Sequence, residues 1–137
     1  MVSFFSYAAT DNLRLARSKV VADPSDDSYG LIHMPRYAFV TGVWLKIITP
    51  YSAASTGAIL VGVSGNGVAD DNDAFLVDAD IDEEAAGFYS MMNGGAAAAA
   101  QGYWFDQGSG AITTTFSIGD STNNCTVMVF AQYSVVM

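Results

Sequence analysis

The residues best suited to chemistry are the carboxylates between Asp70 and Glu84, where eight acids fall close together. Oxygen ligands at this density are what a calcium ion requires. The EF-hand loop is nevertheless excluded, because Glu83 stands where its turn glycine belongs and Tyr89 where its bidentate glutamate belongs. A calcium site of another type stays open at the three acids with D-x-D-x-D spacing, Asp78, Asp80 and Asp82. The alternative is a solvated loop whose charges repel one another.

No other pattern indicates catalysis. His33 is the only histidine, which excludes a multi-histidine metal site, and no triad can be assembled around it. Cys125 is the only cysteine, so no intramolecular disulfide can form, and its place in an apolar run predicts a buried thiol. Paired carboxylates could serve a glycosidase, but nothing places two acids on facing walls of a cleft. We therefore expect a protein that is not an enzyme and holds no cofactor.

Aromatic residues offer a binding chemistry instead. A strand candidate contains Trp44, and a short aromatic run follows later in the chain as Tyr103, Trp104 and Phe105. Such side chains can stack on sugars, and they also serve as core residues or as anchors of protein interfaces. The second interpretation is the more common one, and it favours an interface at Trp44.

The composition limits the kind of partner. The chain has 137 residues with a net charge of −9, and only 14% of its residues are charged, against 51% hydrophobic. Soluble domains carry about 25% charged residues, so we expect part of the surface to be covered by partner subunits. Five basic residues against fourteen acidic ones disfavour binding to nucleic acid or to an anionic membrane. No segment has the length of a membrane-spanning helix, and the N-terminus does not have the pattern of a signal peptide.

Apolar and polar residues alternate in most of the chain, which predicts strands. In 111–118 and 125–136 the alternation is clear, and 119–124 contains only turn-forming residues, so we predict an antiparallel hairpin there. Over Tyr37–Thr49 the period of two places Tyr37, Phe39 and Val43 on one face. In Gly57–Ser64 it directs Ile59, Val61 and Val63 inward, before a turn at Gly65-Asn66-Gly67.

The elements together predict an all-β protein: a single antiparallel β-sandwich, jelly-roll-like, with about eight strands. We assign residues 23–137 to the sandwich. Residues 1–22 form an N-terminal arm or the first strands of the same domain. Within that segment we favour an extended chain for residues 11–22 over a short helix, although its leucine, alanine and arginine residues also suit a helix.

Several stretches in this order resemble small β-sandwich virion proteins of tailed bacteriophages, the capsid decoration or cement class. They are Val43–Pro50, Ala58–Val63, Asp70–Leu76, the Gly102-Tyr103 step, Ile112–Thr115 and Val129–Tyr133. The resemblance spans Arg36 to Val136 and consists of strands and turns, without a catalytic signature.

The resemblance implies a structural role. Such a protein is expected to form a homo-oligomer, a trimer, and to bind and stabilise the shell of the major capsid protein at the virion surface, after assembly in the host cytoplasm. It implies an interface that includes the N-terminal aromatic residues, the basic residues that follow them, and Trp44: Phe4, Phe5, Tyr7, Arg14, Arg17, Lys19 and Trp44. The alternative is a carbohydrate- or receptor-binding β-sandwich of a phage fibre or tail.

Overall fold

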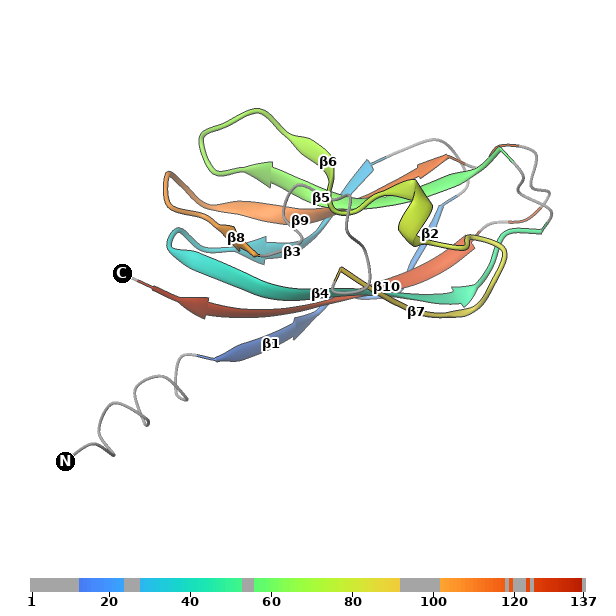
Figure 1. Cartoon of the computed structure of the whole chain (residues 1–137), viewed down its shortest axis with the longest axis horizontal. Helices are drawn as coiled ribbons and strands as arrows, with labels where there is room; N and C mark the ends of the chain where they lie inside the picture. The colour runs from blue at the N-terminus through green and yellow to red at the C-terminus, as the bar shows by residue number, and fades with distance from the viewer. Residues whose placement is uncertain are drawn as a thin grey trace.

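The structure is a computed structural model that describes residues 13–23, 28–52, 56–91, 102–117, 119, 123 and 125–136. These residues form two antiparallel β-sheets stacked on one another (Figure 1). The strands are β1 (Arg14–Arg17), β2 (Val21–Asp23), β3 (Ser28–Met34), β4 (Ala38–Thr49), β5 (Ala58–Gly65), β6 (Asp71–Leu76), β7 (Gly87–Ser90), β8 (Tyr103–Trp104), β9 (Gly110–Ser117) and β10 (Cys125–Val135). A 3-10 helix, η1 (Asp78–Asp80), lies between β6 and β7.

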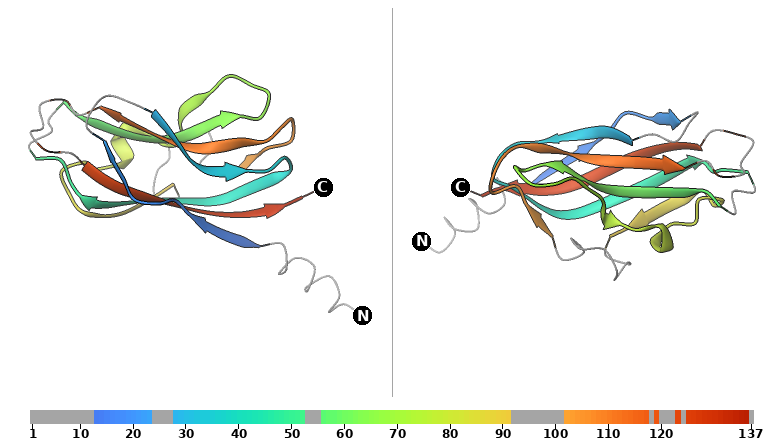
Figure 2. Two further views of the ribbon diagram at one scale, coloured as in Figure 1. Left: turned by 180° about the vertical axis from the view of Figure 1, so that it is seen from behind. Right: turned by 90° about the horizontal axis from the view of Figure 1, so that it is seen from above.

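Sheet A has the order β1-β10-β4-β7, and its long central strands are β10 and β4. The short strands β1 and β2 follow one another along the outer edge of β10. Likewise β8 and β7 lie along the outer edge of β4. Sheet B has the order β3-β9-β5-β6. The views in Figure 2 show the long strands of both sheets running lengthwise along the sandwich.

The strand order is that of a jelly roll. If β1 and β2 count as one interrupted strand, and β7 and β8 as another, each sheet has four positions, which gives the eight strands of this fold. Among the strands that follow one another in sequence, β5 and β6 form the one pair that shares a ladder. The other connections pass between the sheets or along one sheet edge. The predicted all-β sandwich is therefore confirmed.

The predicted hairpin of the last two strands is wrong. Both strands exist, but β9 lies in sheet B between β3 and β5, and β10 lies in sheet A between β4 and the β1–β2 edge. The physical reason is that alternation fixes which face of a strand is buried and leaves its hydrogen-bonded partner open. A seven-residue connection, 118–124, is also longer than most hairpin loops and is long enough to reach the second sheet, about 10 Å away.

The core lies between the sheets and consists almost entirely of apolar side chains. Its largest fully buried members are Phe75, Phe105, Phe116, Met34, Leu45, Ile47, Ile59, Leu76, Met91, Ile112, Val40 and Val43. Burying one such side chain contributes about 1.5–3 kcal/mol. Cys125 is buried, as predicted. The three inward residues predicted for β5, Ile59, Val61 and Val63, are buried as well.

A β-bulge reverses the two faces of β4 near its start. The register against β10 shifts between Val40 and Gly42, so that Thr41 is the extra residue. The inward residues are consequently Ala38, Val40, Val43, Leu45 and Ile47. The predicted facing is wrong for the first part of this strand, because Phe39 shares the outer face with Trp44 and lies opposite to Val43. A single extra residue reverses a period of two, and the sequence carries no sign of it.

Two polar side chains hold the ends of the strands together. In the turn between β5 and β6, Asn66 is 4% exposed and has a left-handed backbone, with φ of 59°. Its Nδ2 donates to the Tyr103 hydroxyl at 3.1 Å and to the Trp104 carbonyl at 3.3 Å, and its Oδ1 accepts from two backbone N–H groups of the β8–β9 loop. Between β1 and β2, the Ser18 hydroxyl accepts from Val129 N at 2.9 Å, which continues the ladder across the break. Within the described residues, no helix has the length and hydropathy needed to cross a membrane.

Candidate partner-binding face

The outer face of sheet A carries an unusual set of side chains for a solvated sheet surface. Antiparallel sheets of this kind bury one face and usually present polar residues on the other. Here the outward positions include six large apolar residues, which we call the aromatic face: Leu15, Trp44, Ile48, Phe88, Met128 and Phe130. Leu15 is 72% exposed, Phe88 63% and Ile48 41%.

The strand register brings two of the predicted interface residues together. Arg17 in β1 pairs with Phe130 in β10, and Phe130 pairs with Trp44 in β4. Side chains in such cross-strand pairs lie about 4.5–5.5 Å apart at their Cβ atoms. Arg17 and Trp44 therefore flank Phe130 in one row across the outer face, although they come from opposite sides of β10.

The Trp44 indole covers the sheet surface beside it. A Cβ atom on Gly42 would lie 2.5 Å from Cη2 of Trp44, so the glycine leaves the space that the ring occupies. Phe88 lies in the row of Lys46, next to the row of Phe130, and the two ring centroids are 6.1 Å apart at an interplanar angle of 47°. Lys46 Nζ lies 5.3 Å from the Phe88 ring centroid, a cation–π contact. The face thus combines a tilted pair of aromatic rings with a cation.

The charges on this face have one sign. Among the outward positions of β1, β4, β7 and β10, the charged residues are Arg17 and Lys46, and none is acidic. The whole chain has fourteen acidic residues and a net charge of −9. The described outward positions of these four strands therefore carry two positive charges in a chain that is acidic as a whole.

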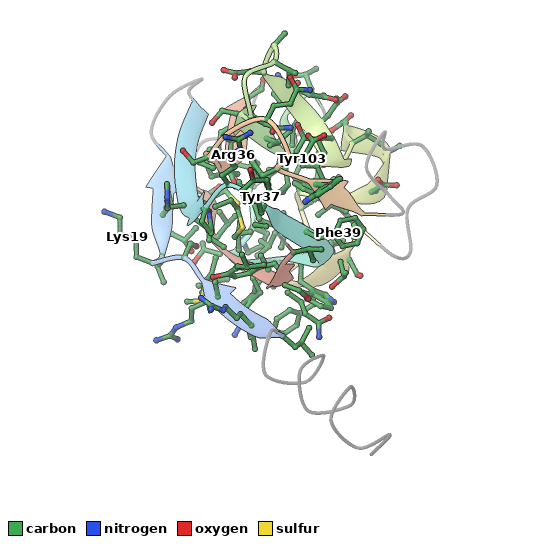
Figure 3. All side chains as sticks on the ribbon, turned by 90° about the vertical axis from the view of Figure 1, so that its left-hand side faces the viewer. Lys19, Arg36, Tyr37, Phe39 and Tyr103 are labelled. Carbon is green, nitrogen blue, oxygen red and sulfur yellow. The ribbon has the colours of Figure 1, made fainter. Side chains whose placement is uncertain are left out.

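The other predicted interface residues lie elsewhere. Arg14 pairs with Tyr133, on the side of β1 that also bears the inward Ala16, and Lys19 is exposed in the segment between β1 and β2. Figure 3 shows Lys19 apart from the aromatic side chains at the end of the sandwich, where Arg36, Tyr37 and Tyr103 are gathered. The predicted residues Phe4, Phe5 and Tyr7 lie outside the described residues.

Residues 103–105 divide between core and surface. Phe105 is fully buried, and the Tyr103 ring packs against it edge to face with centroids 5.0 Å apart. Trp104 instead is 45% exposed and pairs with Phe39 on the outer side of the sheet. The core interpretation thus holds for Phe105, whereas Trp104 lies at the surface.

The acidic stretch is held by turns of the backbone. Asp80 Oδ2 accepts from Val77 N at 3.2 Å, and Asp82 Oδ1 accepts from Glu84 N at 3.1 Å. In the part of the chain that the structure describes, no three His, Cys, Asp or Glu side chains are grouped so that they could hold a metal ion. Asp78, Asp80 and Asp82 are therefore not brought together as a calcium site there.

Two carboxyl groups of this region have perturbed pKa values. Burial raises the pKa of the Glu83 carboxyl above its ordinary value, and the charges of Asp78, Asp82 and Glu84 raise it further, whereas a backbone hydrogen bond lowers it. The hydrogen bond with the Asp71 side chain raises the pKa of Asp73, and burial adds to the effect. Repulsion between neighbouring carboxylates accounts for the charge-driven part of these shifts.

The sequence analysis missed most of the aromatic face. Phe88, Phe130 and Lys46 were not singled out, although aromatic residues at the outward positions of a strand are the available signal. That signal could not be used for β4, because the bulge at Thr41 changes which residues face outward. For β10, the erroneous hairpin assigned a neighbour from the wrong sheet.

The fold and the aromatic face together define a jelly-roll β-sandwich that presents one apolar, weakly basic sheet surface. No protein-family model and no curated protein matches the sequence. Solved structures with a similar fold include chains of three phage capsids. A chain in the acid-stable capsid of Helicobacter pylori bacteriophage KHP30 is 17% identical, with a TM-score of 0.62, over 90% of this chain and 89% of that one.

Two further capsids contain similar chains. One is in the capsid asymmetric unit of cyanophage Pam1, with 15% identity and a TM-score of 0.59 over 91% of this chain and 86% of that one. The other is in the capsid of Ralstonia phage GP4, with 14% identity and a TM-score of 0.63 over 91% and 85%. At these identities the comparisons establish a shared fold. Because both chains are nearly covered each time, the matched chains are similar in length to this one.

Proposed function

We propose that this chain is a structural protein of a bacteriophage virion, a capsid decoration or cement protein that binds and stabilises the shell of the major capsid protein. The observation that carries the proposal is the likeness to chains of three phage capsids, each over at least 90% of this chain. A likeness of this extent concerns the whole architecture and not one motif.

The distribution of apolar surface supports attachment to an existing shell. A subunit that builds a closed shell has to contact neighbours on several sides, whereas a subunit that is added to a shell needs one adhesive face. The aromatic face supplies such a surface on sheet A. Aromatic residues and arginine are enriched in the centres of protein interfaces, where they carry most of the binding energy.

The proposal includes a homo-oligomer, a trimer, at the outer surface of the capsid, assembled in the host cytoplasm. The basic residues Arg14, Arg17 and Lys19 face acidic groups of a partner, and the segment with Phe4, Phe5 and Tyr7 adds as a strand to a neighbour. Mass measurement of the isolated protein by light scattering tests the oligomer, for which three copies are expected. A monomer or dimer across the working concentration range would remove the trimer from the proposal.

The first experiment asks whether the protein is part of the virion. Particles of the phage whose genome encodes the chain are purified, and their proteins are identified by mass spectrometry, while cryo-electron microscopy locates the sandwich. We expect many copies at symmetry-related positions on the outside of the shell. Absence from purified particles would overturn the proposal, and density confined to tail or fibre would overturn the capsid assignment.

A second experiment tests the aromatic face without changing charge. Phe88→Ser removes the most exposed aromatic ring of the face, and Val68→Ser removes an apolar side chain of similar type, 46% exposed, in the β5–β6 turn. Loss of an interface anchor costs about 2 kcal/mol or more, or at least about 30-fold in affinity. We expect that loss for Phe88→Ser in binding to particles that lack the chain, and less than about 3-fold for Val68→Ser. Equal effects of the two variants would contradict a role for the face.

A carbohydrate- or receptor-binding module of a fibre or tail is the second candidate, and one observation favours it. Trp104 is 45% exposed and Trp44 lies over Gly42, so two indole rings border the outer side of sheet A. Indole rings can stack on the apolar faces of sugars as they do on other rings. Binding to a glycan array that disappears in Trp104→Ala, together with absence from the capsid, would select this function.

A further inference from the structure

The aromatic face has a property that its apolar content alone does not explain, namely its two cations. Arg17 and Lys46 belong to a set of five basic residues in a chain of net charge −9, and both point outward from sheet A. The described residues supply neither cation with a carboxylate partner. Two basic groups without an acid on the same sheet face give that face a selective attraction for anions.

We propose that the aromatic face binds an acidic protein surface, one with an apolar centre and carboxylates that pair with Arg17 and Lys46. The inference rests on the proposed function, since the partner is then a shell subunit. It goes further in specifying which sheet faces the shell and which chemistry the shell presents there. Arg17 and Lys46 are the residues that determine specificity, and the apolar side chains of the face supply the apolar contact.

The register sets the spacing of the complementary carboxylates. Arg17 is two strands away from β4, and Lys46 lies two residues along β4 from Trp44, which is in the row of Arg17. With strands about 4.8 Å apart and about 3.3 Å per residue, the Cα atoms of the two cations are about 12 Å apart. Phe130 and Met128 lie between them in β10. A matching partner therefore holds two carboxylates on either side of an apolar patch.

The size of the face suits a protein partner. Four strands about 4.8 Å apart, with about eight residues each, give a footprint of about 500 Å² in projection. A standard protein interface buries about 800 Å² of accessible surface on each partner. The sheet face thus accounts for most of one interface, and loops at its border can provide the remainder.

Charge argues against a second copy of the chain as the occupant. If the face paired with itself around a two-fold axis, the same patch would meet its own copy, so that cations face cations. Each copy also carries a net charge of −9, which adds long-range repulsion. An acidic partner removes the first of these penalties and turns Arg17 and Lys46 into attractive contacts.

Charge reversal tests the inference with the full chain and particles that lack it as the probe. The variants are Arg17→Glu and Lys46→Glu, singly and together, with Arg36→Glu as the control for an exposed cation outside the proposed interface. We expect the double variant to bind at least about 100-fold more weakly, and Arg36→Glu less than about 3-fold. Affinity of the wild-type chain should fall as salt rises, and that dependence should be weaker in the double variant.

The neutral variants Arg17→Gln and Lys46→Gln replace the reversals if thermal unfolding shows that a reversal disturbs the fold. Unchanged particle binding of the charge variants, with Phe88→Ser still defective, would overturn the acidic partner and leave the proposed function intact. Dimerisation of the wild-type chain that is lost in Arg17→Glu would assign the face to a second copy and overturn the inference. A wild-type chain that binds no particles would overturn both proposals.

Discussion

The outer faces of the two sheets are built by the same alternation and have opposite chemistry. On sheet A the outward positions carry aromatic rings, such as Phe88 and Phe130, and a cation–π contact. On sheet B the outward positions of β5 and β9 carry small or hydroxyl side chains and a single large apolar one, Leu60; the others are Ala58, Gly62, Ser64, Ala111, Thr113, Thr115 and Ser117. Both sheets bury an apolar inner face, so the outer faces differ for a reason other than folding. The outer face of sheet B has the composition of a solvated surface, and that of sheet A has the composition typical of a protein interface.

The two faces also use glycine differently. Gly42 on sheet A makes room for a side chain, the Trp44 ring. Gly62 on sheet B makes room for backbone, because a Cβ atom there would overlap Asp71 and Asn72 of β6. The register of β5 and β6 shifts at this crossing. One glycine therefore shapes the aromatic face, and the other allows the backbone of β6 to approach β5 closely.

The largest expected effect follows from this difference. Gly62→Ala should lower the free energy of unfolding by about 3 kcal/mol, because backbone has to move, whereas Gly42→Ala should cost about 1 kcal/mol, because the Trp44 ring can swing away. Chemical denaturation of the two variants measures both values. Gly42→Ala should instead weaken particle binding, as the indole leaves its place on the face. A larger loss of stability in Gly42→Ala than in Gly62→Ala would contradict the assignment of the two glycines.

The next effect concerns the link between the sheets. Asn66 in the turn of β5 and β6 holds Tyr103 and Trp104 of sheet A, so Asn66→Ala should destabilise the protein by about 2–3 kcal/mol through buried groups left without partners. Asn66→Asp keeps the acceptor for the loop N–H groups and loses both donors. Its stability should therefore lie between that of Asn66→Ala and that of the wild type. Asn66→Gly separates the side-chain effect from the left-handed backbone, which glycine adopts freely.

Thermal unfolding and denaturant titration measure the three Asn66 variants. Quenching of Trp104 fluorescence by iodide adds a readout at the surface, and its exposure should increase where the Asn66 donors are lost. An Asn66→Ala protein as stable as the wild type would show that the two sheets are held together without this side chain.

Local patterns in the sequence were sufficient for the fold class and for the strands, because alternation and turn residues act over a few neighbours. The confirmed examples are the inward residues of β5 and the turn at Asn66. Strand pairing was not accessible. Each central strand offers two equivalent hydrogen-bonding edges, and the choice between them depends on all other strands. That is why the terminal hairpin was wrong while the sandwich was right.

For the candidate face, too, local patterns predicted individual residues but could not predict which strands would bring them together. Trp44 and Arg17 were predicted as interface residues, one from its aromatic ring and one from its charge. Their meeting depends on β10, which inserts between β1 and β4 and brings Phe130 into the row. No local signal connects these three positions. The face becomes visible only when register and the bulge at Thr41 are known.

The smallest effect concerns the acids that the aromatic face excludes. Glu83 lies in the β6–β7 connection, where burial and then neighbouring carboxylates raise its pKa above the ordinary 4.5. The folded state therefore binds more protons than the unfolded state between these two pKa values, and stability falls as pH rises through that window. Glu83→Gln should remove this fall, so the variant should gain in melting temperature relative to the wild type on going from pH 4 to pH 7. The gain should be small, because the group is largely solvated and its charges are screened.

Glu84→Gln removes the same charge from an exposed neighbouring position and serves as the control for the overall repulsion of the acidic stretch. If the two variants gain equally with pH, the effect comes from net charge and not from the burial of Glu83. If Glu83→Gln loses stability relative to the wild type as pH rises, the Glu83 carboxylate is stabilised in the fold, and a cation held by this stretch becomes the better explanation. Equal gains would mean that long-range charge alone distinguishes the acidic stretch from the aromatic face. A larger gain for Glu83→Gln would instead link that difference to the burial of individual acids.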